Sequence, residues 1–174
     1  MQVSASLSTP HRREMKFASS FLLIFAGFQF IYSSLGDSAV QRLLIEDLTV
    51  QPCAMIINAV APQEHVQAFG HSLVSPWARL NVLSGCEGIE SILLIVAALC
   101  AYRLSLQAKI KGVLSAIGLM YLVNQIRLVT LYFSYRYNKD LFALIHGYIG
   151  PTLIMAIGTA FFLWWITKHP VVKP

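Results

Sequence analysis

The stretch Ile110–Phe133, IKGVLSAIGLMYLVNQIRLVTLYF, decides the fold class of this chain. It is mostly apolar over more than the about 20 residues that an α-helix needs to cross a bilayer. Three further runs have the same character, at Phe17–Leu35, about Gly88–Leu106 and about Leu141–Thr167. We therefore predict an all-α integral membrane protein, built as a bundle of about four transmembrane helices.

The composition supports the same fold class. Hydrophobic residues make up 56% of the chain and charged residues 12%, whereas a soluble domain carries about 25% charged residues. The net charge is +5, but the basic residues lie between the apolar runs, which suits membrane orientation and not nucleic-acid binding. We expect one membrane domain, residues 1–174, and the alternative for the first run is a cleaved signal peptide.

The polar segments complete the predicted topology. Residues 1–16 precede the first span, and residues 37–85 separate it from the second. Within that second segment, Ala39–Leu48 has apolar residues at helical spacing, which favours a helix lying on the membrane surface. Partial alternation of polar and apolar residues in His65–Val74 and Ala78–Leu83 indicates a β-hairpin.

Lysine and arginine near the span ends predict the orientation. The N-terminal segment, the turn around Arg103–Lys111 and the C-terminal tail together hold eight of the thirteen basic residues. Four spans with both termini in the cytoplasm place all three clusters there. We therefore predict a multi-pass protein of the bacterial inner membrane, with residues 37–85 facing the periplasm.

Three reactive residues are predicted to share one depth in the membrane. Ionisable residues in such positions are costly and are functional candidates by default. At about 1.5 Å of rise per residue, Cys86, Arg127 and His146 lie roughly 25, 24 and 33 Å above the nearest cytoplasmic basic residues. The hydrocarbon core is about 30 Å thick. All three side chains are therefore expected near the outer boundary, on three different helices.

This trio fits acyl transfer through a thioester. Cysteine is nucleophilic as the thiolate, and a helix N-terminus or a cation lowers its pKa. Cys86 is expected to open the second span and to benefit from both. His146 can exchange protons with the thiol and the leaving amine. Arg127 stays charged and can stabilise an oxyanion.

Two further polar residues are predicted to support the trio. Glu90 is expected one helical turn from Cys86 on the same face, where it can orient Arg127 or His146 or neutralise a charge. Asn124 lies one turn deeper than Arg127 and indicates a polar pocket. No cofactor and no metal ion is implied.

Each reactive residue also has a purely structural interpretation. Cys86 can be a small core hydrophobe, and Arg127 can reach the outer headgroups as an anchor. His146 can be an ordinary interfacial histidine. A disulfide between Cys53 and Cys86 is a further alternative outside the cytoplasm.

Two other functions compete with acyl transfer. One is a non-enzymatic small membrane scaffold or transporter subunit, which needs no reactive trio. The other is a metal-dependent membrane hydrolase that uses three histidines, His65, His71 and His146, although their spacing matches no strong zinc signature.

The same residues carry a resemblance to a known family. The runs Ser84–Glu90, Asn124–Arg127 and Leu144–His146 resemble, in order, the Cys-x-Gly, Asn-x-x-Arg and His blocks of the exosortase/archaeosortase family. The resemblance covers about residues 79–165, and the stretch NQIRLVTLYF looks most like the exosortase H branch. Glu87 departs from the pattern, because many members carry serine there.

The resemblance implies a membrane cysteine protease or transpeptidase. Its substrates would be exported proteins with a C-terminal sorting signal, which consists of a short proline-containing motif, a transmembrane helix and a basic tail. The enzyme would cut near the motif and pass the protein to an acceptor that the sequence does not identify. By this match, Cys86 is the nucleophile, His146 the acid/base and Arg127 the electrostatic stabiliser.

Overall fold

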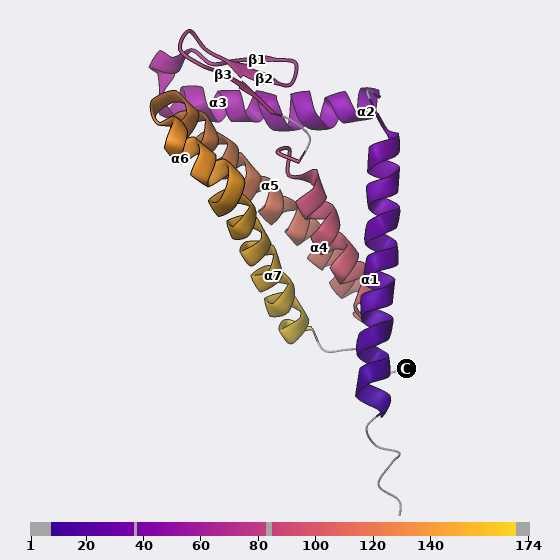
Figure 1. The fold of residues 1–174 in the computed structure, drawn as a ribbon. Coiled ribbons are helices and arrows are strands. Elements are labelled where there is room, and N and C mark those ends of the chain that lie inside the picture. The colour runs from indigo at the N-terminus through magenta and orange to yellow at the C-terminus, as the bar shows by residue number, and fades with distance from the viewer. Residues whose placement is uncertain (1–7, 37, 83–84, 170–174) are drawn as a thin grey trace, which may run out of the picture.

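The computed structural model describes residues 8–36, 38–82 and 85–169 of the chain. It is mostly helical, with a small antiparallel sheet at one end (Figure 1). This architecture confirms the predicted fold class. The helices in chain order are α1 (Ser8–Ser34), α2 (Ala39–Arg42), the π-helical η1 (Leu43–Val50), α3 (Gln51–Val60), the short η2 (Pro62–Glu64), α4 (Ile89–Ala101), α5 (Leu106–Tyr137), α6 (Lys139–Leu144), the π-helical η3 (Ile145–Ile149) and α7 (Gly150–Lys168).

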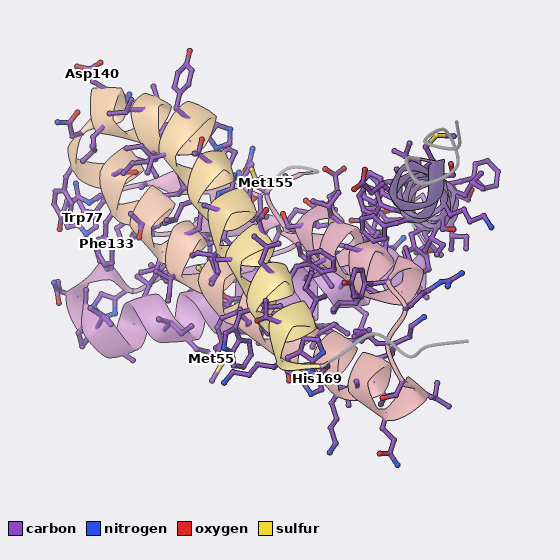
Figure 2. The ribbon with its side chains drawn as sticks, turned by 90° about the horizontal axis from the view of Figure 1, so that it is seen from below. Met55, Trp77, Phe133, Asp140, Met155 and His169 are labelled. Atoms are coloured by element: carbon purple, nitrogen blue, oxygen red, sulfur yellow. The ribbon has the colours of Figure 1, made fainter. Side chains whose placement is uncertain are left out.

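Three of the predicted spans correspond to long helices. They are α1, α5 and the continuous helix formed by α6, η3 and α7. Each is long and apolar enough to cross a membrane. Figure 2 shows α1 end-on, set to one side, while the α6–α7 helix runs from Asp140 at one end to His169 at the other.

The turn between the last two long helices depends on Asn138. Its extended backbone (φ −154°) ends α5, and its side-chain oxygen accepts hydrogen bonds from the backbone N–H groups of Asp140 and Leu141, both at 3.0 Å. Asparagine is a preferred N-cap because it satisfies N–H groups that the first helical turn leaves without partners. One residue therefore ends α5 and begins α6.

The predicted span at 88–106 is shorter than expected. The observed helix, α4, has 13 residues and at 1.5 Å per residue is about 20 Å long, against a hydrocarbon core of about 30 Å. It begins late because Gly88 has a left-handed backbone conformation (φ +81°), and it ends where Tyr102 becomes extended. Lys109 donates a hydrogen bond of 2.6 Å to the Cys100 carbonyl at its end.

The helix predicted over Ala39–Leu48 is present and is longer than expected. α2, η1 and α3 form one helix over Ala39–Val60, which we call the surface helix after its predicted position and which lies across the end of α1 (Figure 1). By length and composition this helix, too, is long and apolar enough to cross a membrane. It continues through Pro52, which has no N–H to give to the carbonyl of Leu48 four residues earlier. Gln125 of α5 donates a hydrogen bond of 3.5 Å to that carbonyl.

The predicted hairpin is confirmed and has one strand more. β2 (Ser72–Val74) pairs antiparallel with β3 (Arg79–Asn81), and β1 (Gln67–Phe69) pairs with the other edge of β2. The predicted strand His65–Val74 therefore splits in two. Gly70 (φ +55°) makes the intervening turn, and glycine adopts this left-handed conformation without steric conflict.

Two apolar clusters hold the helices together. The upper cluster packs the surface helix and the sheet on α5, through residues such as Ile57, Leu73 and Leu128. The lower cluster packs α4, α5 and α7, through residues such as Leu99, Met120 and Ile154. On α5 the fully buried residues of the lower cluster end at Met120 and those of the upper cluster begin at Leu128, and buried Asn124 and Gln125 lie between them. A polar layer therefore separates the two clusters.

The buried carboxylate of Glu64, just before the sheet, binds side chains of α5. Glu64 is 2% exposed, and its side chain accepts hydrogen bonds from the hydroxyls of Tyr132 (2.8 Å) and Tyr137 (3.1 Å). Arg136 Nε lies 3.5 Å from Glu64 Oε2. The Arg136 guanidinium also lies over the rings of Trp77 and Tyr137, at 5.0 and 5.1 Å. Glu64 therefore joins the loop before the sheet to the end of α5.

We predict that Glu64→Leu lowers the thermal unfolding midpoint in detergent by about 6–12 °C, because removing one partner of a buried charged network typically costs about 3 kcal/mol or more. Tyr137→Phe is the matched control and should give a much smaller shift, because it removes only the 3.1 Å hydrogen bond to Glu64 and Tyr137 is an exposed residue. Equal midpoints for Glu64→Leu and the wild type would contradict this role.

Candidate active site

The structure brings Cys86 and His146 together. Cys86 Sγ lies 3.9 Å from His146 Nδ1, although the two residues are 60 positions apart in the sequence. Cys86 belongs to the turn before α4, and His146 belongs to η3. A separation near 4 Å suits a thiol–imidazole pair in a substrate-free site, where catalytic hydrogen bonds are often longer than in the loaded enzyme.

Cys86 lies in a turn flanked by two glycines. Gly85 and Gly88 both have positive φ values, +89° and +81°, a conformation that glycine adopts readily. Gly88 is the N-cap of α4, so the helix begins at Ile89. The expectation that Cys86 opens the helix is therefore wrong, because Glu87 and Gly88 lie between Cys86 and the first helical residue, Ile89.

Asn124 of α5 binds the backbone of this turn. Its Nδ2 donates hydrogen bonds to the carbonyl oxygens of Cys86 (3.3 Å) and Glu87 (2.8 Å). A Cβ atom at Gly88 would lie 2.5 Å from Asn124 Cγ, so a larger residue would push the asparagine away. Glycine at position 88 is thus needed both for its backbone conformation and for the close approach of Asn124.

Arg127 reaches the same site over a glycine of the next helix. It lies on α5 almost one turn after Asn124. A Cβ atom at Gly150 would lie 2.9 Å from Arg127 Nε, which is buried and has no hydrogen-bond partner within the described residues. Gly150 follows His146 by four residues, about one helical turn. The Arg127 side chain that packs on Gly150 therefore lies on the same side of the site as His146.

The charges around Cys86 act in opposite directions. Burial raises the pKa of the Cys86 thiol above its ordinary value, the positive charge of Arg127 lowers that pKa, and the negative charge of Glu87 raises it. The net direction is upward. The expected lowering is therefore wrong in sign, because desolvation of the half-buried thiol outweighs the cation.

His146 is positioned by the helix around it. It lies in η3, where the helix has the wider π-helical turn, a form that is frequent at functional sites. Its ring stacks on Phe142, with centroids 5.3 Å apart and planes 7° from parallel. Phe142 in turn meets the edge of Tyr135 of α5. This stacking fixes the plane of the imidazole while the residue itself stays exposed.

Glu90 lies in the first turn of α4. Because α4 begins at Ile89, Glu90 is not one helical turn from Cys86, and the expected shared face is absent. It is exposed and lines a pocket of about 410 Å³ with residues of α1 and α2, among them Tyr32 and Gln41. The supporting role predicted for Glu90 beside Arg127 or His146 stays a prediction.

Sequence reasoning did not assign Glu87 or Gly150 to the site, and it missed Tyr32. Glu87 is 4% exposed and accepts a hydrogen bond of 2.7 Å from the Tyr32 hydroxyl. The spacing of Gly150, four residues after His146, is a signal that the sequence does offer. Nothing in the sequence pairs Tyr32 with a residue 55 positions later.

The remaining cysteines and histidines lie elsewhere. Cys53, Cys86 and Cys100 are all free thiols, so the disulfide between Cys53 and Cys86 is not formed. His71 pairs with Glu46 at 3.3 Å beside the sheet. Within the described ranges, no three His, Cys, Asp or Glu side chains lie close enough to share a metal ion.

Comparison with known proteins assigns the family. A family model described as transmembrane exosortase (Exosortase_EpsH) matches residues 12–165. No curated protein and no solved structure matches the chain. The matched range covers most of the chain and includes the glycine-flanked cysteine, the asparagine and arginine of α5, and the histidine of η3. The chain belongs to the transmembrane exosortase family.

Proposed function

We propose that this exosortase is a membrane-embedded cysteine protease/transpeptidase that cleaves C-terminal sorting signals of exported proteins through a thioester intermediate. The observation that carries the proposal is the 3.9 Å approach of Cys86 Sγ to His146 Nδ1 beside the charge of Arg127. Nucleophile, acid/base and electrostatic stabiliser are the three parts that acyl transfer requires. Membership of the exosortase family supports the same assignment.

The raised pKa defines the resting state of the nucleophile. Because burial raises the pKa of the Cys86 thiol, the sulfur is mostly protonated near neutral pH. Attack therefore requires a base, and His146 Nδ1 is the ring nitrogen that faces the sulfur. A neutral imidazole can accept the proton on Nδ1 when its own hydrogen is on Nε2.

The reaction then proceeds in two halves. Cys86 Sγ forms a bond to the scissile carbonyl carbon as its proton passes to His146, and Arg127 stabilises the oxyanion. The C–N bond breaks, the amine leaves with the proton from His146, and a thioester remains. An acceptor N–H or O–H group, or water, then attacks the thioester and gives its proton to His146. The C–S bond breaks, and the proton returns to Cys86.

The basic clusters support the proposed location. With both termini and the turn between α4 and α5 in the cytoplasm of a bacterium, the sheet and the surface helix lie on the periplasmic side of the inner membrane. The site then lies near the outer boundary. A substrate helix packing laterally against the bundle would present its proline-containing motif beside Cys86, while its basic tail stays in the cytoplasm.

We predict that Cys86→Ala abolishes processing of a reporter that carries a C-terminal sorting signal, while the variant still inserts into membranes. Cys100→Ala is the matched control, because Cys100 is a free, partly buried thiol on α4, and it should process the reporter normally. Gel-shift analysis of the reporter measures both. Normal processing by Cys86→Ala would end the proposal.

His146→Gln should slow reporter processing by about 10²–10⁴-fold, the usual contribution of a general acid–base residue. At high pH, where the thiol ionises without help, Cys86 in this variant should still react with iodoacetamide. Single-turnover processing and mass spectrometry of the Cys86 peptide provide the two readouts. Equal loss of alkylation at high pH would indicate a misfolded site instead of a missing base.

Arg127→Gln should move the pH profile of Cys86 alkylation to higher pH. The positive charge of Arg127 lowers the pKa of the thiol, so its removal raises that pKa further. Arg127→Lys keeps a positive charge and should show a smaller shift. The alkylated fraction of Cys86, measured by mass spectrometry across pH, checks this, and an unchanged profile in Arg127→Gln would contradict the placement of the charge.

A further inference from the structure

Glu87, the residue after the nucleophile, has an unusual environment. The residue is 4% exposed. One carboxylate oxygen, Oε1, accepts a hydrogen bond of 2.7 Å from the Tyr32 hydroxyl. The other, Oε2, is buried and has no hydrogen-bond partner among the described residues. Burial of a half-satisfied carboxylate is unfavourable for stability, so its presence beside Cys86 points to a role in the site.

Tyr32 connects Glu87 to a helix that is otherwise little buried. The apolar part of α1 contributes no buried residue, and α1 packs mainly on α4. At its far end α1 makes aromatic contacts, such as Phe17 with Tyr102. At its near end Tyr32 donates the hydrogen bond to Glu87. This bond therefore links α1 directly to the cysteine turn.

We propose that Tyr32 and Glu87 are positioning residues for acyl transfer: Tyr32 fixes the Glu87 carboxylate, and Glu87 in turn holds the Cys86 turn so that Sγ faces His146. This inference rests on the proposed function. It assigns no contact with substrate to either residue.

The backbone of the turn supports this proposal. Residue 87 is held from two sides, because Asn124 of α5 binds its carbonyl at 2.8 Å and Tyr32 of α1 binds its side chain. On either side of the Cys86–Glu87 pair lie Gly85 and Gly88, both in left-handed conformations. Glycines confer little stiffness on a turn, so the direction of Sγ depends on how residue 87 is held.

The charge of Glu87 adds a second effect. Groups that face the turn from the packed elements are Arg127 of α5, His146 of η3 and Tyr32 of α1, with Glu90 of α4 acting on Tyr32. Glu87 raises the pKa of the Cys86 thiol and thereby opposes Arg127. Thiolate character makes cysteine prone to oxidation. The Glu87 carboxylate therefore favours the protonated thiol of Cys86 before substrate binds, and the thiol proton remains available for transfer to His146.

Substitutions at Tyr32 and Glu87 can separate the positioning effect of their hydrogen bond from the effect of the Glu87 charge. Glu87→Gln keeps an oxygen that can accept from Tyr32 but removes the charge, whereas Glu87→Leu removes both. Tyr32→Phe keeps the carboxylate but removes its anchor, and the ring borders the 410 Å³ pocket, so no enclosed core cavity is created. Ser34→Ala is the matched control on α1, because the Ser34 hydroxyl bonds the Phe30 carbonyl of its own helix.

The experiment uses the full-length protein in detergent and two readouts, the reporter processing rate and the pH profile of Cys86 alkylation. Glu87→Gln should move the alkylation profile to lower pH, the opposite direction to Arg127→Gln, and should process faster than Glu87→Leu. Tyr32→Phe should process about tenfold more slowly than the wild type, as expected when a hydrogen bond to a charged group is lost. Ser34→Ala should match the wild type in both readouts.

The double variant Tyr32→Phe/Glu87→Leu should be no slower than Glu87→Leu alone, because residues that act through one contact are not additive. Additive losses, or an unshifted alkylation profile in Glu87→Gln, would overturn the inference. The alkylation readout requires no substrate. If Cys86→Ala still processed the reporter, the proposed function would fall, whereas the profile of Glu87→Gln would still show whether the Glu87 charge acts on the Cys86 thiol.

Discussion

The site depends on one side-chain amide. Asn124 donates from a single nitrogen to the carbonyl oxygens of Cys86 and Glu87, and so fixes the turn that precedes α4. Inside a membrane protein, exposed backbone carbonyls need such a partner, because little water is available to replace it. The close fit of Asn124 on Gly88 makes this contact specific. Without it, the position of Cys86 would not be fixed relative to α5, and hence not relative to Arg127.

The polar layer between the two apolar clusters gives this contact its setting. On one side of this layer, α4, α5 and α7 pack through the lower apolar cluster. On the other side, the surface helix and the sheet pack on α5 through the upper cluster. The side-chain amides of two adjacent α5 residues, Asn124 and Gln125, bind segments on opposite sides of this layer. Asn124 holds the cysteine turn, and Gln125 holds the carbonyls of the surface helix around Leu48. Two adjacent residues of α5 thus bind both the turn that carries Cys86 and the surface helix.

Much of this architecture is predictable because membrane depth is readable from hydropathy. Apolar runs located three of the long helices, and counting residues from their basic ends placed Cys86, Arg127 and His146 at one level. Local turn geometry is harder to read, because the start of α4 depends on Asn124, which lies far along the chain from Gly88. The direction of the Cys86 pKa was missed for a related reason: burial depends on the assembled helices. The Tyr32 contact with Glu87 has no sequence signal.

The shortness of α4 has a consequence for the surrounding lipid. A helix of 13 residues leaves roughly a third of a 30 Å hydrocarbon slab unmatched on its side of the bundle. Bilayers respond to such hydrophobic mismatch by thinning locally or by letting headgroups and water sink inward. The lipid next to α4 would therefore be deformed even before any substrate arrives. Under the proposed function, a substrate approaching from that side would lose part of its membrane cover, and water or an acceptor amine would reach it more easily there than in an intact bilayer.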